Sequence, residues 1–253
     1  MADVEKLALT YYTDPWCPWS WAAEPSLRRL QAEFGDTLAI GYVIGGLGGA
    51  APDPREWLEA GAQSGMPVDP RAVMASPPAA TQPAGLAVKA VAEQADPGPY
   101  LRRLREAIFV ERRTPDRGDA LLELARDTTP ELDLGRLRIA FGSHGPLEAL
   151  GADLERARGR SLPTLEVGAT AVDGRAGYDA WRAAVIAGGT EPVEGGRLDV
   201  EGMLRRFGPA TTAEVAAVCD LPGPRAPAEL WRRALEWRVR PEAVLGGQLW
   251  HLA

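Results

Sequence analysis

The sequence predicts an α/β fold whose sheet is interrupted by a large helical insertion and followed by a small winged-helix-like C-terminal module. Residues 7–13 and 38–44 have strand character and flank a helical pattern, so the chain opens with a βαβ unit of two parallel strands. From about 50 to 160 only helical patterns occur. Strand character returns at 164–167, which places strands of one sheet on both sides of the helical segment.

The sequence marks the boundaries of the first strand, helix and second strand. Leu7 to Thr13 is apolar and aromatic and ends at the turn signal Asp14-Pro15. A helix follows Cys17-Pro18, because apolar residues recur there at helical spacing. These residues are Ala23, Leu27, Leu30 and Phe34. Leu38 to Ile44 reads as the second strand and ends at Gly45-Gly46.

Aspartate–proline pairs mark several helix starts in the insertion. Asp53-Pro54 and Asp69-Pro70 each place an N-cap residue before a proline at the first helical position, and Asp96-Pro97 opens a third helix. Apolar residues at helical spacing define the remaining helices. The residues with this spacing are Val88, Val91, Ala92 and Ala95; Tyr100, Leu104, Ile108 and Phe109; Leu121, Leu122, Leu124 and Ala125; Leu134, Leu137 and Phe141; and Leu147, Leu150 and Leu154.

Two further strands and a helix complete the first domain. Thr164 to Val167 and Ala171-Val172 are separated by a short turn, and a helix runs from about Tyr178 to Ala187. The glycine-rich segment 188–196 reads as a linker. The predicted domains are therefore 1–190, with the insertion at about 50–160, and 191–253.

Three helices and a hairpin predict a winged-helix-like module over 191–253. Thr211 and Glu214 form a capping box that starts the second helix, and Gly246-Gly247 makes a two-residue turn between the strands of the hairpin. The module has eight basic and nine acidic residues, so its charge of −1 argues against nucleic-acid binding. We expect it to pack on the first domain, to act as a lid or to form a homodimer contact.

Composition excludes several classes of protein. The 253 residues carry a net charge of −7, which disfavours coating nucleic acid or an anionic membrane. Two cysteines and two histidines, Cys17, Cys219, His144 and His251, share no metal-ligand spacing and cannot build a disulfide scaffold. We expect no metal. The N-terminal residues lack a signal-peptide pattern and no apolar run would span a bilayer, so we expect a cytoplasmic protein.

The segment 14–21, Asp-Pro-Trp-Cys-Pro-Trp-Ser-Trp, is the sharpest chemical feature of the sequence. It places Cys17 between a strand and the first turn of a helix, where the helix N-terminus favours a thiolate and should lower the thiol pKa. Ser20, one helical turn on, is placed to hydrogen-bond the sulfur. The alternative is a buried structural cysteine. Trp16, Trp19 and Trp21 either line an apolar substrate groove or belong to the core.

This segment resembles the active-site motif of the DsbA-like branch of the thioredoxin superfamily. FrnE-like members carry Cys-Pro-Trp-Cys where this chain has Cys17-Pro18-Trp19-Ser20, and kappa-class glutathione transferases and 2-hydroxychromene-2-carboxylate isomerases carry Ser-Pro-Tyr-Ser. The resemblance spans about 1–190 and also covers Glu24-Pro25, Gly45-Gly46-Leu47, Thr81-Gln82-Pro83-Ala84 and Ser161-Leu162-Pro163-Thr164.

The resemblance implies a thioredoxin fold and a site around Cys17. Pro163 would be the cis-proline that faces the sulfur, and Leu162 would present its backbone to a bound thiol or peptide. With Trp16, Pro18 and Trp19 these residues would bind substrate, while Cys17 and Ser20 would be catalytic. The glycine-rich loop after residue 44 would border the cleft.

Ser20 occupies the position of the resolving cysteine, so Cys17 cannot complete a dithiol cycle with it. A mixed disulfide on Cys17 would need an external thiol such as glutathione, mycothiol or bacillithiol as co-substrate, with no tightly bound cofactor. This predicts a monothiol oxidoreductase that acts on a disulfide. Two alternatives stay open: a thiol-dependent transferase or isomerase that acts on an electrophile, and a non-catalytic adaptor. Cys219 is expected in the core and His144 in a surface loop.

Overall fold

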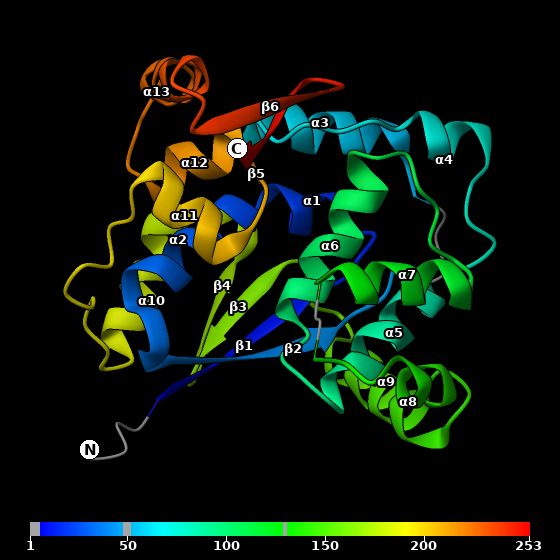
Figure 1. Ribbon diagram of the computed structural model, residues 1–253. Helices are drawn as coiled ribbons and strands as arrows, with labels where there is room; N and C mark the ends of the chain where they lie inside the picture. Colours follow the sequence, from blue (N-terminus) through cyan, green and yellow to red (C-terminus); the bar gives the residue numbers. More distant parts are fainter. Residues whose placement is uncertain (1–5, 48–51, 129–130) are drawn as a thin grey trace.

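The computed structural model describes residues 6–47, 52–128 and 131–253, and they form a mixed α/β structure (Figure 1). Its main sheet has the strand order β2-β1-β3-β4. β1 (Leu7–Thr13) pairs in parallel with β2 (Leu38–Ile44) and antiparallel with β3 (Thr164–Val167). β4 (Thr170–Asp173) pairs antiparallel with β3 at the edge. The predicted fold class and strands are confirmed.

The helical segment between β1 and β2 is two helices rather than one. α1 (Pro18–Ala22) is followed by α2 (Glu24–Phe34), with a break at Ala23. Pro25 lies in the first turn of α2 and has no N–H to donate to the preceding turn, so a new helix starts there more readily than the old one continues.

The insertion is helical throughout the part that the structure describes. Its helices are α3 (Pro54–Ser64), α4 (Arg71–Ala75), α5 (Gln82–Ala92), α6 (Gly98–Phe109), α7 (Gly118–Thr128), α8 (Leu134–Ala140) and α9 (His144–Arg156). Asp53 caps α3 as predicted. Asp69 and Asp96 also accept backbone N–H groups, but α4 and α6 begin one residue after the predicted proline.

Alternation along β1 directs neighbouring side chains to opposite sides of the sheet. Tyr11 is fully buried and packs edge-on against Trp181 of α10 (Tyr178–Ala187). Tyr12 points the other way, where its hydroxyl accepts a hydrogen bond from Arg156 at the end of α9. The sheet therefore lies between α10, with α2 beside it, and the last helix of the insertion.

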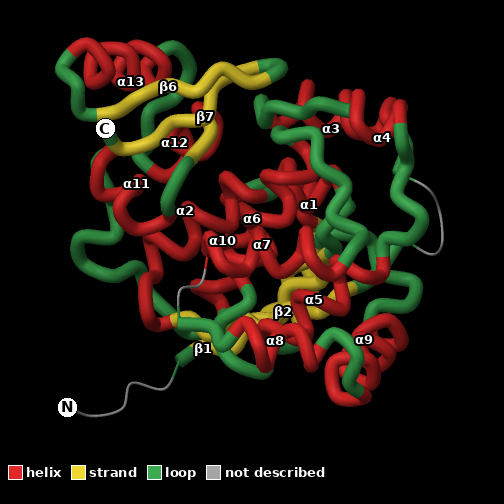
Figure 2. The backbone as a smooth tube through the Cα atoms, turned by 45° about the vertical axis from the view of Figure 1, so that its right-hand side comes forward, coloured by secondary structure: helices red, strands yellow, loops and turns green. Residues whose placement is uncertain are grey.

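The C-terminal segment forms its own small sheet and core. Its elements are α11 (Val200–Phe207), β5 (Ala210–Thr211), α12 (Thr212–Val218), α13 (Arg225–Leu235), β6 (Val239–Val244) and β7 (Gly247–Leu252), with strand order β5-β7-β6. The capping box of Thr211 and Glu214 is present. α12 packs on α2, and both views show the segment seated over that helix (Figures 1 and 2). The winged-helix assignment stays a prediction.

Within the described residues, no helix is both long enough and apolar enough to cross a membrane.

Candidate active site

Cys17 lies at the junction of β1 and α1, as the sequence predicts. It is the N-cap residue of α1, with Pro18 at the first helical position. Its sulfur lies 3.6 Å from the carbonyl oxygen of Leu162, which precedes β3. The Leu162–Pro163 peptide bond is cis, the geometry that the resemblance implies. Segments separated by about 145 residues thus meet at the thiol.

The thiol environment differs from the predicted one. Cys17 is only 4% exposed and packs against Trp19 and Ala60. Burial raises the pKa of its thiol above the ordinary 9.0, and the charge of Asp14 raises it further, while Ser20 and Arg105 oppose the increase. The prediction of a lowered pKa is therefore wrong, because loss of hydration outweighs the helix N-terminus.

Ser20 is fully buried one turn after the cysteine. The proximity of its side chain and backbone counteracts part of the rise in the Cys17 pKa. Its hydroxyl nevertheless has no partner with good hydrogen-bond geometry among the described residues. Ser20 lies where the sequence placed it, beside the sulfur, but its effect on the Cys17 pKa is smaller than that of burial.

Asp14 is a site residue that sequence reasoning missed. It was interpreted only as a turn signal, yet its carboxylate is 2% exposed and accepts a 2.8 Å hydrogen bond from the backbone N–H of Trp16. Burial raises its pKa from 3.8 to about 6, against the hydrogen bonds from the backbones of Trp16 and Gly46 and the charge of Arg105. Its position at the end of a buried strand, three residues before a cysteine, was the available signal.

The three tryptophans of the motif have different surroundings. Trp16 and Trp21 are fully buried in the main core, so the expectation that Trp16 lines a substrate groove is not supported. Trp19 donates from its indole to Glu56 at 2.7 Å, and the guanidinium of Arg175 lies 3.9 Å from its ring. Trp19 also borders a cavity of about 280 Å³. Pro18 and Trp19 are both buried.

A larger cavity of about 500 Å³ adjoins the thiol site. Its walls include Asp14, Leu162 and the loop residues Gly45 to Leu47, so this part of the glycine-rich loop borders the cleft as expected. Gly48 and Gly49 lie outside the described residues. A Cβ at Gly45 would lie 2.8 Å from the Leu162 side chain, so glycine there permits the close approach. Thr81 and Gln82 also line this cavity.

The remaining singled-out residues lie away from this site. Cys219 is 5% exposed in the core of the C-terminal segment, where burial raises its thiol pKa to about 12, and both cysteines are free. His144 is exposed at the start of α9 rather than in a loop. His251 contacts Glu242 at 2.9 Å.

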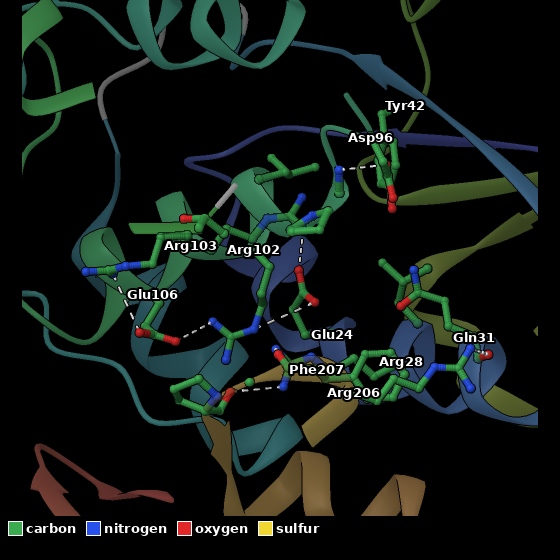
Figure 3. A pocket seen from close by; sticks show the side chains of 18 of the residues that line it. Glu24, Arg28, Gln31, Tyr42, Asp96, Arg102, Arg103, Glu106, Arg206 and Phe207 are labelled. Atoms are coloured by element: carbon green, nitrogen blue, oxygen red, sulfur yellow. Dashed lines mark hydrogen bonds and ion pairs between the residues drawn. The ribbon is translucent and has the colours of Figure 1, made fainter. Parts of the chain in front are cut away.

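A cavity of about 560 Å³ lies between α2, α6 and the loop after α11, and its walls are strongly charged. Figure 3 shows Arg102 between Glu106 and Glu24, with Arg28 and Phe207 nearby. The sequence analysis did not single out these charges, because residues far apart in the chain supply them.

Comparison with known proteins identifies the family to which this fold and thiol site belong. The profile of a family described as thioredoxin matches residues 11–165, more than half of the chain. The chain belongs to this thioredoxin family. Solved structures named as a probable DsbA oxidoreductase and as a 2-hydroxychromene-2-carboxylate isomerase share its fold, so the predicted resemblance and fold are confirmed.

Among individual proteins, the chain is similar to SpxH from Halalkalibacterium halodurans, named as a ClpXP adapter protein. The two are 25% identical, and the match covers 96% of this chain and 88% of SpxH. The cytosolic disulfide reductase DsbM from Pseudomonas aeruginosa superposes with a TM-score of 0.57 at 23% identity, over 72% of this chain and 98% of DsbM. A 2-hydroxychromene-2-carboxylate isomerase superposes at 0.52 and 17% identity, over 72% and 95%.

Proposed function

We propose that this thioredoxin-family protein is a polypeptide-binding adapter that works with ClpXP. The observation that carries the proposal is the similarity to the SpxH adapter, which extends over 96% of the chain and so takes in most of the C-terminal segment. The similarity to DsbM, which is named as a disulfide reductase, covers only 72%. The similarity to the adapter therefore covers a larger part of this chain than the similarity to the reductase, and this favours an adapter function.

The geometry of the thiol also favours binding over catalysis. A thiol with a raised pKa is almost entirely protonated at neutral pH, and the protonated form is a poor nucleophile. Ser20 cannot resolve a mixed disulfide, and Cys219 is buried in a different core. A site with these properties is better suited to binding an extended peptide segment beside Leu162 than to rapid thiol–disulfide exchange.

The C-terminal segment offers a surface for such binding. Trp231, Leu235 and Trp237, at the end of α13 and just beyond it, are 47%, 82% and 87% exposed. Large exposed apolar side chains close together in sequence are characteristic of protein-binding surfaces, in which tryptophan is often an energetic anchor.

The test is the affinity of the purified protein for ClpXP, measured by surface plasmon resonance with wild type, Cys17→Ala and Trp237→Ala. Leu58→Ala, which truncates another exposed apolar side chain (53% exposed), is the matched control. We expect Cys17→Ala and Leu58→Ala to bind as wild type does, and Trp237→Ala to bind about tenfold more weakly. Absence of binding by the wild type would refute the adapter proposal.

A second candidate is monothiol exchange, favoured by the contact between the Cys17 sulfur and the Leu162 carbonyl beside a 500 Å³ cavity. The Cys17 thiolate would attack one sulfur of a disulfide, form a mixed disulfide and release the other sulfur as a thiolate. A small thiol such as glutathione, mycothiol or bacillithiol would then attack and regenerate Cys17. Glutathione is present in a DsbM structure. Pro163, Pro18 and Trp19 would shape the site.

If the same site binds an electrophile in place of a disulfide, the protein would be a thiol-dependent transferase or isomerase. Intact-mass analysis after incubation with oxidised glutathione, together with a turnover assay on an electrophile, distinguishes monothiol exchange from this alternative. Monothiol exchange predicts one adduct that is absent from Cys17→Ser and present in Cys219→Ala. A transferase predicts turnover of an electrophile that persists in Cys17→Ser. No adduct and no turnover would leave only the adapter.

A further inference from the structure

A buried network of alternating charges runs between the thiol site and the C-terminal segment. Its members are all less than 9% exposed and comprise three arginines and three glutamates, so their charges balance. They are Glu24, Arg28, Arg102, Arg105, Glu106 and Glu214. Part of the network forms the wall of the 560 Å³ cavity in Figure 3.

At the thiol end the network contacts the backbone that holds Cys17. The Cys17 N–H donates to the carbonyl of Asp14 at 3.3 Å, and the guanidinium of Arg105 donates to the same carbonyl at 3.4 Å. Arg105 also donates to the hydroxyl of Thr13 and pairs with Glu24. The charge of Arg105 thus lies at the end of β1, next to the cysteine.

From Glu24 the network continues through α6 to α12. Arg102 lies 3.9 Å from Glu24 and 3.1 Å from Glu106. Its Nε and Nη2 donate to the two carboxylate oxygens of Glu214 at 3.0 and 3.1 Å, a bidentate pair. Glu214 is fully buried and accepts the backbone N–H of Thr211 at 2.7 Å, as part of the capping box.

The same glutamate also helps to seat the C-terminal segment on α2. Arg28 of α2 lies 3.2 Å from Glu214 and donates to the carbonyls of Phe207 and Pro209 at 3.1 and 3.2 Å. One carboxylate therefore contributes both to the docking of the segment and to the charge balance around Arg102.

We propose that this network couples the docking of the C-terminal segment to the reactivity of the Cys17 thiol, with Glu214 as the contribution of the segment. In a buried, weakly screened environment the loss of one charge is felt by the others along the chain of contacts. Without the negative charge of Glu214, Arg102 interacts more strongly with Glu24. Arg105 is then freer to stabilise a Cys17 thiolate.

Three groups face the thiol and set the background for this effect: Asp14 from the β1–α1 turn, Tyr11 from β1 and Arg105 from α6. Of these three groups, Arg105 is the one that belongs to the network, and it is also the one with a positive charge. Glu214 and Arg102 are accordingly positioning residues that act through it. The inference holds whether the site serves an adapter or an exchange reaction.

The test is the rate of Cys17 alkylation by iodoacetamide as a function of pH, in full-length protein with the Cys219→Ala background. Glu214→Gln should raise the rate at a given pH about threefold, because it makes the network more positive and lowers the thiol pKa. Arg102→Gln and Arg28→Gln should lower it by a similar factor. Glu201→Gln is the matched control, since Glu201 is also buried but pairs with Arg233 and Arg238 inside the C-terminal segment.

The opposite changes in alkylation rate that we expect for the glutamate and arginine variants distinguish electrostatic coupling from a general loosening of the packing. A variant that only loosens the packing exposes the thiol and speeds alkylation whichever charge is removed. If Glu214→Gln does not fold, as judged by circular dichroism, the arginine variants test the proposal alone. Faster alkylation in Arg102→Gln and Arg28→Gln, or rates in Glu214→Gln equal to those in Glu201→Gln, would overturn it.

Discussion

Asp14→Asn should make the protein more stable at neutral pH, although it alters a buried, hydrogen-bonded side chain. Asp14 is 2% exposed, and burial raises the pKa of its carboxyl from 3.8 to about 6. At neutral pH the folded protein therefore holds a carboxylate in a place that favours the neutral acid. An asparagine there is neutral at every pH.

The size of the effect follows from the difference between the folded and unfolded pKa. A rise of about two units costs about 3 kcal/mol of stability at neutral pH. The sign is set by the folded state, which binds the proton more tightly: this contribution to the free energy of unfolding is complete below 3.8 and is lost as the pH rises through about 6. Asparagine keeps the bond from the Trp16 N–H but loses one from Gly46, at a cost of about 1 kcal/mol. The net gain at neutral pH is about 2 kcal/mol.

Urea unfolding of wild type and Asp14→Asn between about pH 4 and pH 8 measures this difference directly. The two curves should cross in the acidic part of the range, with the variant less stable below the crossing. Asp53→Asn is the control, because Asp53 is an exposed helix cap whose pKa is lowered by Arg55. Asp53→Asn should be less stable than wild type only at pH values above the lowered pKa of the Asp53 carboxyl. Parallel pH curves for wild type and Asp14→Asn would refute the reasoning.

Three further predictions follow from specific contacts. Gly45→Ala should displace the Leu162 side chain, because the new Cβ would lie 2.8 Å from it, and should lower the free energy of unfolding by about 1–3 kcal/mol in urea titrations; an unchanged value would contradict the geometry. Cys219, with a pKa of about 12, should resist iodoacetamide in the native protein and react only on unfolding, which peptide mapping would detect. Lys89→Ala should destabilise the protein by about 2 kcal/mol, because it leaves the largely buried Asp153, 2.8 Å away, without its cation; thermal melts would check this.

Local signals in the sequence predicted most of the elements correctly. The strand at 7–13 ends at Asp14-Pro15, and the capping box starts α12. A two-residue turn joins β6 and β7 as predicted, but Leu245 and Gly246 form it rather than Gly246 and Gly247, because Gly247 pairs with Val244 as the first residue of β7. Each depends on backbone rules that act within a few residues. The break between α1 and α2 was missed, although Pro25 marks it, because the apolar spacing continues through it.

The chemistry of the site could be predicted only in part. The motif and the cis-proline placed Cys17 beside Leu162, but the pKa of the thiol depends on burial by Ala60 and Trp19, which only the tertiary fold brings together. The buried charge network was not predicted either. Arginine and glutamate at helical spacing usually lie on a solvated face, and Arg102 is buried between Trp21 and Glu214, which only the tertiary fold brings together.

The ionisation of Cys17 tests most directly whether this protein works by binding rather than by thiol chemistry. The measurement is the pH dependence of alkylation in the Cys219→Ala variant, which reports Cys17 alone. We predict a midpoint above the ordinary thiol pKa of 9.0, because burial dominates the environment of the sulfur. A midpoint below neutral pH would contradict this and would identify Cys17 as an activated nucleophile.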